Sequence, residues 1–532
     1  MSNWRPPGPN WRETAAGWAR DVTLRVGGDA AAAIVEWPSV YPEALPEVRL
    51  VEPPRHATAH VSWRGHICLA HRDHVLLDTS RPQDVLDELV ARAEAILEVP
   101  RSEQERDLYD EYTSFWVDIV EHVITTTFEP DGKVQSISYD PRRALPDGMP
   151  STLDRYDRHP SGHARGLYVP LNWEARPPLP SMGSSAWELC QRLYEAADND
   201  VRAQVERKLE GRDVLVFGVS RPSGDRTMVG MRITRKGPRH PLHGGRLRSA
   251  TPFACRRVDR AFVAPRGGAL PLQGRRVVVA GCGAVGAHVV LELVRAGVGH
   301  LSLIDPDTMT PANTFRHALG LHLDYPDKVT ALREYIQGRW PYVQVDTRAL
   351  SVGLALRQDP AVFDDADLIV LTTGSARSEL AFAADLRRQR PGGATLIHGW
   401  VEPLGLGGAA LRVTTDQPGC LHCLHCDEYG GFTECKVAMI ASGQAVEADL
   451  DGCGDRFVPF GSLDALKTAV CVTDMALETL LGRDHSSEIR SWRGARDQAD
   501  ARGVQVSRYF SDGAAVVAAS RFCHPACPTC GP

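Results

Sequence analysis

The feature that most constrains the fold is the run GCGAVG at residues 281–286. It follows RRVVVA (275–280), a nearly continuous apolar segment typical of a strand buried on both faces of a parallel sheet. A helical segment and a second strand, HLSLID (300–305), come next. Glycines in the GxGxxG spacing let a backbone turn tightly and approach phosphate groups at a helix N-terminus, so the sequence predicts a Rossmann-like nucleotide-binding unit. These glycines are Gly281, Gly283 and Gly286.

The second strand of this unit ends at Asp305, about 20 residues after the glycines, where a carboxylate binds ribose hydroxyls in dinucleotide-binding folds. NAD binding is therefore the first interpretation. The next residues argue against it, because a site that holds a triphosphate and releases pyrophosphate needs charged and amide groups where charge develops on oxygen. The residues in question are Asp307, Asn313, Arg316 and Lys328.

The segments GCGAVG, LIDPD and NTFRH, together with Lys328, resemble the ThiF/MoeB/ubiquitin-activating adenylyltransferases. The resemblance implies an enzyme that uses ATP and Mg²⁺ to adenylate the C-terminal carboxylate of a small protein. Asp305 would hold the ribose, while Asn313, Arg316 and Lys328 would face the phosphates. One position departs from the family, because Gly374 stands where a magnesium-binding Asp is expected. Asp307 or another nearby carboxylate is the candidate replacement, and a Rossmann-like domain without adenylation is the alternative.

Two CxxC pairs lie about a hundred residues apart in the C-terminal part of the chain. Two such pairs predict a tetrahedral Cys₄ zinc site even at this separation. The ThiF/MoeB resemblance carries over to all four positions and implies that Zn²⁺ has a structural role. Free or redox-active thiols are the alternative. The four cysteines are Cys420, Cys423, Cys527 and Cys530.

Cys453, in DLDGCGDRF, is flanked by Gly and Asp and is expected in an exposed loop. Related activating enzymes carry a nucleophilic cysteine between the adenylation site and the following helix. Cys453 fits this place best, and Cys435 is the alternative. Cys471 lies within an amphipathic helical pattern, so we interpret it as a small core residue. The resemblance implies a thiolate that attacks the acyl-adenylate and forms a thioester.

The stretch YPEALPEVRLVEPPRHATAHVSWRGHICLA (41–70) resembles the core of ubiquitin-conjugating enzymes, above all in Gly-x-Ile-Cys-Leu around Cys68. The resemblance implies that Cys68 receives an acyl group by transthiolation and passes it to an amine, which requires an exposed and partly ionised thiol. Eukaryotic members have His-Pro-Asn, whose Asn helps to stabilise an oxyanion, where this chain has Thr-Ala-His. His60 is therefore the candidate for polarising the carbonyl, and an ordinary surface histidine is the alternative.

The predicted fold class is α/β with three parts. A helix is expected over 84–97 and another over 184–209, and the stretch 141–183, rich in Pro, Gly, Ser and Arg, is interpreted as loop or linker. The middle part carries no assigned chemistry. The parts are an α+β ubiquitin-conjugating-like domain at 1–120, a linker or uncharacterised α+β domain at 121–265, and a Rossmann-like ThiF/MoeB-type adenylation domain with its Cys₄ site at 266–532.

Composition excludes few classes but favours some. A length of 532 residues predicts several domains, and 43% hydrophobic with 24% charged residues is typical of a globular protein. The net charge of −7 gives no support for nucleic-acid or membrane-surface binding. No signal peptide or membrane-spanning pattern is recognised, so we expect a cytoplasmic protein.

A conjugating-like region before an activating-like region resembles the bacterial fused enzymes of the CBASS anti-phage systems. The resemblance implies adenylation, a thioester on Cys453, transfer to Cys68 and ligation to a target-protein amine. In that family the cargo is a cGAS-like nucleotidyltransferase, whose conjugation primes second-messenger synthesis. A bacterial ubiquitin-like modifier is the alternative cargo. Sulfur activation and a degenerate nucleotide-binding scaffold are further alternatives, and the resemblance also implies a homodimer through the adenylation domain.

Overall fold

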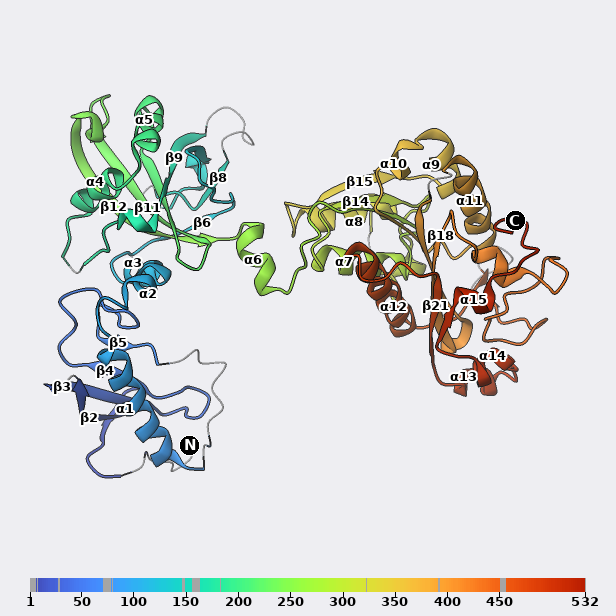
Figure 1. Cartoon of the computed structure of the whole chain (residues 1–532), viewed down its shortest axis with the longest axis horizontal. Coiled ribbons are helices and arrows are strands. Elements are labelled where there is room, and N and C mark those ends of the chain that lie inside the picture. The colour runs from blue at the N-terminus through green and yellow to red at the C-terminus, as the bar shows by residue number, and fades with distance from the viewer. Residues whose placement is uncertain are drawn as a thin grey trace. The chain divides into compact units, whose positions relative to one another are not determined.

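The computed structural model describes residues 6, 8–26, 29–69, 78, 80–145, 149–155, 163–181, 183–321, 323–390, 393–449 and 456–531. The chain divides into two compact units, residues 1–263 and 264–532, which can be followed by colour in Figure 1. The predicted α/β class is confirmed, with an α+β region first and a Rossmann-like sheet in the second unit. No helix among the described residues is long and apolar enough to cross a membrane.

The first unit begins with an antiparallel sheet in the order β1-β2-β3-β4-β5, covered by helix α1. The helix predicted over 84–97 is α1, and it turns Val85, Leu86 and Ala93 toward the sheet. The core of this region forms where apolar strand residues such as Leu24 and Val48 meet that face. The elements are β1 (Arg12–Thr14), β2 (Gly17–Val26), β3 (Asp29–Pro38), β4 (Glu47–Leu50), β5 (His66–Ile67) and α1 (Pro82–Glu98).

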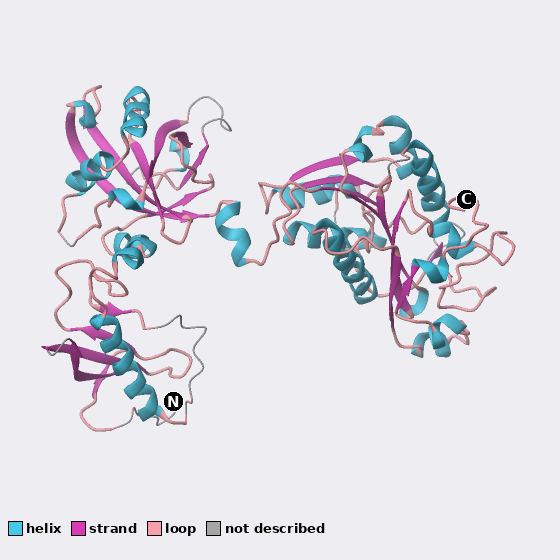
Figure 2. Ribbon diagram, in the orientation of Figure 1, coloured by secondary structure: helices cyan, strands magenta, loops and turns pink. Residues whose placement is uncertain are grey.

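The rest of the first unit is a closed barrel in the order β10-β11-β12-β6-β8-β7-β9, with helices α4 and α5 packed against it. Figure 2 shows its strands in magenta. The elements are β6 (Val123–Thr126), β7 (Gln135–Tyr139), β8 (Thr152–Arg155), β9 (Ala164–Leu171), α4 (Ala186–Glu195), α5 (Asn199–Lys208), β10 (Val214–Ser220), β11 (Arg226–Lys236), β12 (Arg246–Arg257) and α6 (Arg260–Arg266), with single turns at 141–143, 173–175 and 241–243.

Two expectations for the middle region were wrong in detail. The stretch 141–183 contains two barrel strands, β8 and β9, and most of β9 is buried, since its apolar residues face the barrel interior or the helices. The helix expected over 184–209 is two helices that break around Asp198. Ser185 is the N-cap of α4, because its hydroxyl accepts a hydrogen bond from the amide of Glu188 at 3.4 Å.

Helices α2 (Glu105–Asp110) and α3 (Tyr112–Val117) join the antiparallel sheet region to the barrel. Tyr112 and Trp116 belong to the hydrophobic core that the barrel shares with α4 and α5. The indole Nε1 of Trp116 donates to the main-chain oxygen of Phe253 on β12 at 2.9 Å. Phe115, on the opposite side of α3, packs against Trp63 of the sheet region. Aromatic side chains on two sides of α3 therefore join the two regions of the first unit.

The second unit is built on a sheet in the order β15-β14-β13-β16-β17-β18-β21-β22. The strands from β15 to β17 run parallel, and β18, β21 and β22 extend the sheet in antiparallel fashion. The strands are β13 (Arg276–Ala280), β14 (His300–Ile304), β15 (Gln344–Arg348), β16 (Leu368–Leu371), β17 (Thr395–Val401), β18 (Gly407–Thr414), β21 (Glu488–Arg493) and β22 (Val516–Ala518), with a separate pair β19 (Ala448–Asp449) and β20 (Arg456–Phe457).

Helices cover both faces of this sheet (Figure 2). Alternate residues of β13 enter different cores: Val277 and Val279 pack with α7, α8 and α12, whereas Val278 and Ala280 pack with α9, α10 and α11. The apolar run therefore predicted a doubly covered strand correctly. The helices are α7 (Gly286–Arg295), α8 (Lys328–Gln337), α9 (Val352–Gln358), α10 (Ala361–Asp364), α11 (Ala376–Gln389), α12 (Ser462–Leu480), α13 (Asp497–Ala501), α14 (Arg508–Asp512) and α15 (Ala519–Phe522), with single turns at 311–313, 403–405 and 421–425.

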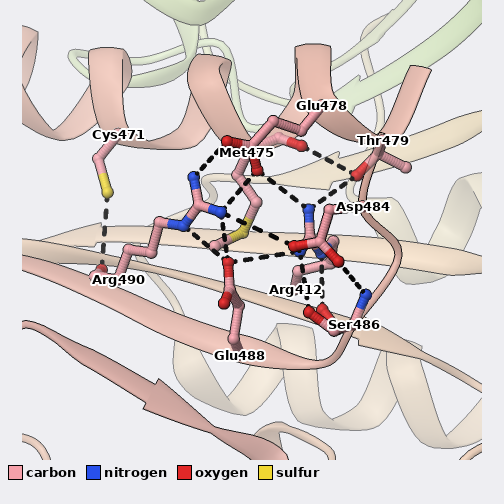
Figure 3. Close-up of polar contacts among 9 residues, drawn as sticks. All are labelled: Arg412, Cys471, Met475, Glu478, Thr479, Asp484, Ser486, Glu488 and Arg490. Carbon is pink, nitrogen blue, oxygen red and sulfur yellow. Dashed lines mark hydrogen bonds and ion pairs between the residues drawn. The ribbon is translucent and has the colours of Figure 1, made fainter. Parts of the chain in front are cut away.

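A charged network fastens the C-terminal end of α12 to β18 and β21 (Figure 3). Arg412 of β18 is fully buried, and its guanidinium lies within ion-pair distance of three carboxylates. Arg490 of β21 pairs with the same acidic residues from the other side. Each of the three carboxylates thus lies within ion-pair distance of both guanidinium groups, so the cluster is an ion-pair network rather than a cation site. The carboxylates are Glu478, Asp484 and Glu488.

Candidate functional site

The three glycines of the predicted loop occupy the turn between β13 and α7, and each meets a different steric demand. Gly281 has φ +89°, and a Cβ there would lie 2.4 Å from the main chain of Thr372. A Cβ on Gly286 would lie 1.8 Å from the Gly281 oxygen, so this glycine lets the helix pack closely against the turn. Nothing lies within 4 Å of a Cβ placed on Gly283. Its backbone is therefore open to a ligand, as the nucleotide-binding spacing requires.

The loop lies at the point where the strand order of the parallel sheet reverses, because β13 pairs with β14 on one side and with β16 on the other. In open α/β sheets, ligands bind at this switch point, outside the carboxyl ends of the strands. The turn after β16 contributes directly to the loop: the hydroxyl of Thr372 donates to the Gly281 oxygen at 2.7 Å. The described residues thus place an open glycine loop at the expected ligand crevice.

The carboxylate of Asp305 is hydrogen-bonded to the backbone of the glycine loop. Its Oδ2 accepts a hydrogen bond from the Cys282 amide at 2.6 Å, and its Oδ1 accepts one from the Asp307 amide at 2.9 Å. Burial raises the pKa of Asp305, whereas Lys328 and these amides lower it. The carboxylate predicted to hold ribose therefore also fixes the backbone of the glycine loop.

His317 is a loop-supporting residue that the sequence analysis did not assign, although it ends the quoted NTFRH motif. Its Nε2 lies 2.9 Å from the Cys282 oxygen, and its Nδ1 accepts from the Leu319 amide at 3.2 Å. Since Nδ1 accepts, Nε2 carries the proton and donates to the loop. The side chain is buried and holds the main-chain oxygen of Cys282, whereas Asp305 holds the amide of the same residue.

Asp307 and Lys328 meet beside Asp305 at the end of β14. The Lys328 ammonium lies 2.8 Å from the Asp307 carboxylate, and the lysine is buried while the aspartate side chain is 65% exposed. Lys328 also opens helix α8. The structure therefore brings Asp305, Asp307 and Lys328 together beside the glycine loop, where the sequence analysis placed all three.

Asn313 and Arg316 make contacts away from the glycine loop. The Asn313 side-chain oxygen accepts from the amide of Thr310 at 2.8 Å and so closes its own turn. The guanidinium of Arg316 lies over the ring of Phe460 at 4.8 Å and near the ring of Phe457. Burial lowers the pKa of Arg316. Their predicted contact with phosphates stays a prediction.

Gly374 follows β16 with φ +69° and an open side-chain position. The buried Glu379 is close by, but its Oε1 accepts from the amide and hydroxyl of Thr373 at 3.0 and 2.8 Å, and its Oε2 pairs with His398 at 2.8 Å. Glu379 is thus occupied in holding the turn. The exposed carboxylate of Asp307 remains the better candidate for Mg²⁺ bound with a nucleotide.

The four predicted metal-binding cysteines converge and are buried. The Sγ atoms lie 3.7 Å apart for Cys420–Cys527, 4.0 Å for Cys420–Cys423 and 3.3 Å for Cys423–Cys530. A tetrahedral ion with Zn–S bonds of about 2.3 Å places its sulfurs about 3.8 Å apart. The distances exclude disulfides, whose sulfurs lie about 2 Å apart. This donor set fits a structural zinc ion.

Cys453, the predicted activating nucleophile, lies outside the described residues. The alternative, Cys435, packs beside the cluster of metal-binding cysteines, and burial raises its pKa to about 11. Cys471 lies in α12, where burial also raises its pKa to about 11. A buried thiol with a raised pKa is a poor nucleophile at neutral pH. Cys435 is therefore a weak alternative, and Cys471 packs against the core of the second unit, as its interpretation as a small core residue expects.

Cys68 follows β5 and is exposed, as predicted. Gly65 makes the tight turn before it, with φ +84° and a would-be Cβ 2.7 Å from the Leu50 oxygen. The pairing of Ile67 with Val48 then fixes the strand, and the thiol emerges where pairing ends. Burial and the charge of Glu111 raise the pKa of Cys68, so the expectation of a partly ionised free thiol is not supported.

His60 lies directly beside Cys68, because the Cys68 amide donates to the His60 oxygen at 2.7 Å. His60 has φ +62°, a left-handed conformation that His and Asn adopt more readily than most residues. Its Nδ1 lies 2.6 Å from Glu111 Oε1, and its amide donates to Glu111 Oε2 at 2.8 Å. The hydrogen bond that His60 donates to Glu111 raises the pKa of His60, against the effect of burial.

Cys68, His60 and Glu111 line a cavity of about 320 Å³ between β5, α1 and α3. The cavity lining is mostly apolar and includes Ile67, Leu89 and Phe115. Glu111 was not assigned from the sequence. The contact between it and His60 joins residues far apart in the chain, which no local pattern reveals.

Models of two known families match separate parts of the chain. Residues 257–502 match the ThiF family, and residues 14–124 match prokaryotic E2 family B. An uncharacterized Sinorhizobium fredii protein, y4qC, is 25% identical over 89% of this chain and 90% of its own length. A second, y4oA, is 31% identical over 36% of this chain. The "ATP-dependent ubiquitin transferase-like protein Cap2" of Pseudomonas aeruginosa is 27% identical over 43% of this chain. The matches span 34% of y4oA and 41% of Cap2.

Proposed function

Because this chain joins a prokaryotic E2 family B domain to a ThiF-family domain and is an adenylyltransferase-type enzyme, we propose that it activates a protein C-terminus and transfers it between two of its own cysteines to an amine. The observation that carries the proposal is the pairing of two sites in one chain: an open glycine loop at the switch point of a parallel sheet, and an exposed cysteine in a cavity beside His60.

The first step is adenylation. A C-terminal carboxylate oxygen attacks the α-phosphorus of ATP, a C–O–P link forms, and the bond to pyrophosphate breaks. Gly283 would leave room for the nucleotide, Asp305 would hold the ribose, and Lys328 would supply charge for the phosphates, which their positions around the glycine loop support. Asn313 and Arg316 would complete the phosphate site. A magnesium ion held near Asp307 would neutralise charge on the departing pyrophosphate.

The next steps move the acyl group. The Cys453 thiolate attacks the mixed anhydride and releases AMP, which forms a thioester. The Cys68 sulfur then attacks that thioester, and the Cys453 thiol is released. Because both cysteines belong to one chain, the second transfer benefits from a high effective concentration. The four-cysteine cluster would hold zinc and stabilise the C-terminal segment.

The cargo is proposed to be a cGAS-like nucleotidyltransferase of a CBASS antiviral operon, and the molecule is proposed to be a cytoplasmic homodimer. Similarity to proteins named Cap2 supports this choice. The words "ubiquitin transferase-like" in those names equally favour a ubiquitin-like protein as cargo, which is the second candidate. Both cargoes present a C-terminal carboxylate, so the chemistry is the same.

The test uses the full chain with ATP and each candidate cargo, followed on non-reducing gels. We expect pyrophosphate exchange that needs a free cargo C-terminus, and a thiol-labile adduct that moves from Cys453 to Cys68. Cys68→Ala should retain the adduct on Cys453, while Cys453→Ala should retain exchange but lose both adducts. An adduct on Cys68 that persists without Cys453 would contradict the proposed order. Exchange without any cargo would contradict adenylation of a protein.

A further inference from the structure

The strongest unassigned feature is the double hydrogen bond between Glu111 and His60 in the cavity of Cys68. One Glu111 oxygen accepts from the imidazole Nδ1 and the other from the amide of the same residue. A carboxylate only accepts, so Nδ1 must carry the proton. The other ring nitrogen, Nε2, is then left with its lone pair whenever the imidazole is neutral. The same arrangement orients the histidine base of a Ser-His-Asp triad.

The cavity is suited to an amine on an alkyl chain. Its lining is mostly apolar and also carries one arginine, two histidines and three carboxylates, here called the rim carboxylates. Each rim carboxylate has a basic partner: Glu111 with His60, Glu88 with Arg92 at 2.6 Å, and Glu47 with His66 at 3.4 Å. When both histidines are neutral, three carboxylates face one arginine, and this excess of negative charge favours a cationic nucleophile over an anionic one.

We propose that Glu111 is a positioning residue that holds His60 so that its Nε2 removes a proton from the attacking amine during discharge of the Cys68 thioester. This inference rests on the proposed function, because it requires an acyl group on Cys68. It assigns His60 a general-base role in place of the oxyanion-donor role suggested by the sequence.

The step balances as follows. The ammonium loses one proton to solvent, and the free amine nitrogen attacks the thioester carbonyl, so a C–N bond forms. Nε2 takes the second proton, and the C–S bond to Cys68 breaks. His60 then returns that proton to the departing thiolate. Burial and Glu111 both raise the pKa of Cys68, so proton return to its sulfur is favourable.

The two roles for His60 predict opposite pH dependence. The free-amine fraction rises with pH in either role, so the rate is divided by that fraction. The rate per free amine then rises through the His60 pKa if His60 is a base, which acts only when neutral, and falls over the same range if His60 is an oxyanion donor. Glu111 raises that pKa, so Glu111→Gln should move the inflection to lower pH. The other charged or titratable groups that face His60 or its cavity are Asp107, Cys68, Glu47, His66, Glu88 and Arg92.

The experiment loads the full chain directly with a fluorescein–Gly-Gly 2-mercaptoethanesulfonate thioester, which bypasses adenylation. Discharge is then measured from pH 6 to 9 with Nα-acetyl-lysine, and with Nε-acetyl-lysine as the control amine. We expect single-turnover discharge that rises with pH and is faster for Nα-acetyl-lysine. His60→Asn keeps the left-handed backbone and an amide donor but removes the base, so it should slow discharge by about 100-fold. Glu111→Gln should shift the inflection downward, while the matched rim change Glu47→Gln should leave it in place.

Several outcomes would overturn the inference. A rate per free amine that falls with pH, or discharge that survives in His60→Asn, would return His60 to the donor role. Equal rates with the two lysine derivatives would mean that the cavity holds the acyl chain and not the amine. If the native chain forms no thiol-labile label, or if Cys68→Ser still forms it, Cys68 is not the acyl acceptor. That result would instead refute the proposed function of this domain.

Discussion

At the scale of single residues, the glycine loop shows how one motif meets separate demands. Gly281 is fixed by its positive φ and by the main chain of Thr372, whereas Gly283 has no neighbour within reach of a Cβ. The spacing of the three glycines predicted the tight turn from the sequence, but not the contact of Gly281 with Thr372. The supports of the loop were harder to predict, because His317 and Thr372 reach it through contacts that depend on the folded backbone.

The contrast between the two glycines can be tested. Gly281→Ala should destabilise the second unit by about 2–3 kcal/mol, because a Cβ at positive φ also meets the Thr372 backbone. Gly283→Ala should leave the melting temperature within about a degree but weaken ATP binding at least about tenfold, because its methyl group would occupy the space of the ligand. Thermal unfolding and nucleotide titration measure the two effects. Equal loss of stability in both variants would contradict these assignments.

At the scale of elements, the ion-pair network at the end of α12 stabilises the join between helix and sheet. The hydrogen bonds of Asp484 with Ser486, together with Arg412, hold the pKa of that carboxyl at about 2, below its ordinary value of 3.8. A depressed carboxyl pKa gives a stabilising contribution that is present above the unfolded value. It is lost as the pH falls through the folded value.

An acid titration checks this sign. The difference in unfolding free energy between the native chain and Asp484→Asn should be constant above pH 5 and should shrink between about pH 4 and pH 2. Chemical denaturation at a series of pH values gives this difference directly. A difference that grows as the pH falls would be inconsistent with the network. Asp512→Asn, an exposed carboxyl in α14, is the control for a general effect of charge.

The metal-binding cysteines join two segments about a hundred residues apart, next to η8 (Leu421–His425) and after α15. Cys420→Ser should lower bound zinc from one equivalent to a small fraction and should lower the melting temperature of the second unit by several degrees. Elemental analysis and calorimetry provide the measurements. Cys523→Ser, outside the four-cysteine cluster, should retain the zinc. Full metal content in Cys420→Ser would exclude the site.

At the scale of the whole molecule, sequence patterns predicted the parallel sheet and the convergence of the four cysteines, and the resemblance around Cys68 predicted its exposure, because each of these has a short local signature. The barrel was not predicted, since its short strands close through pairings far apart in the chain. The His60–Glu111 contact was missed for the same reason. The expected boundary near residue 120 follows directly after α3, whose Tyr112 and Trp116 belong to the barrel core.

Truncation tests this organisation. A fragment of residues 1–120 would expose Tyr112 and Trp116, which are buried in the intact chain, so it should aggregate or bind a hydrophobic dye. A fragment of residues 1–263 keeps both residues buried and should unfold as one cooperative transition. Size-exclusion chromatography and calorimetry compare the two. A soluble, cooperatively folded short fragment would show that the aromatic contact is dispensable.

The aromatic side chains of α3 also bear on how such genes can recombine. A crossover near codon 120 would part Trp116 from the barrel backbone that accepts its hydrogen bond, and both products would inherit half of a core. A crossover near codon 263 separates the compact units and leaves each core intact. Recombination among related genes should therefore preserve the antiparallel sheet region and the barrel as one inherited block, and exchange the second unit at α6.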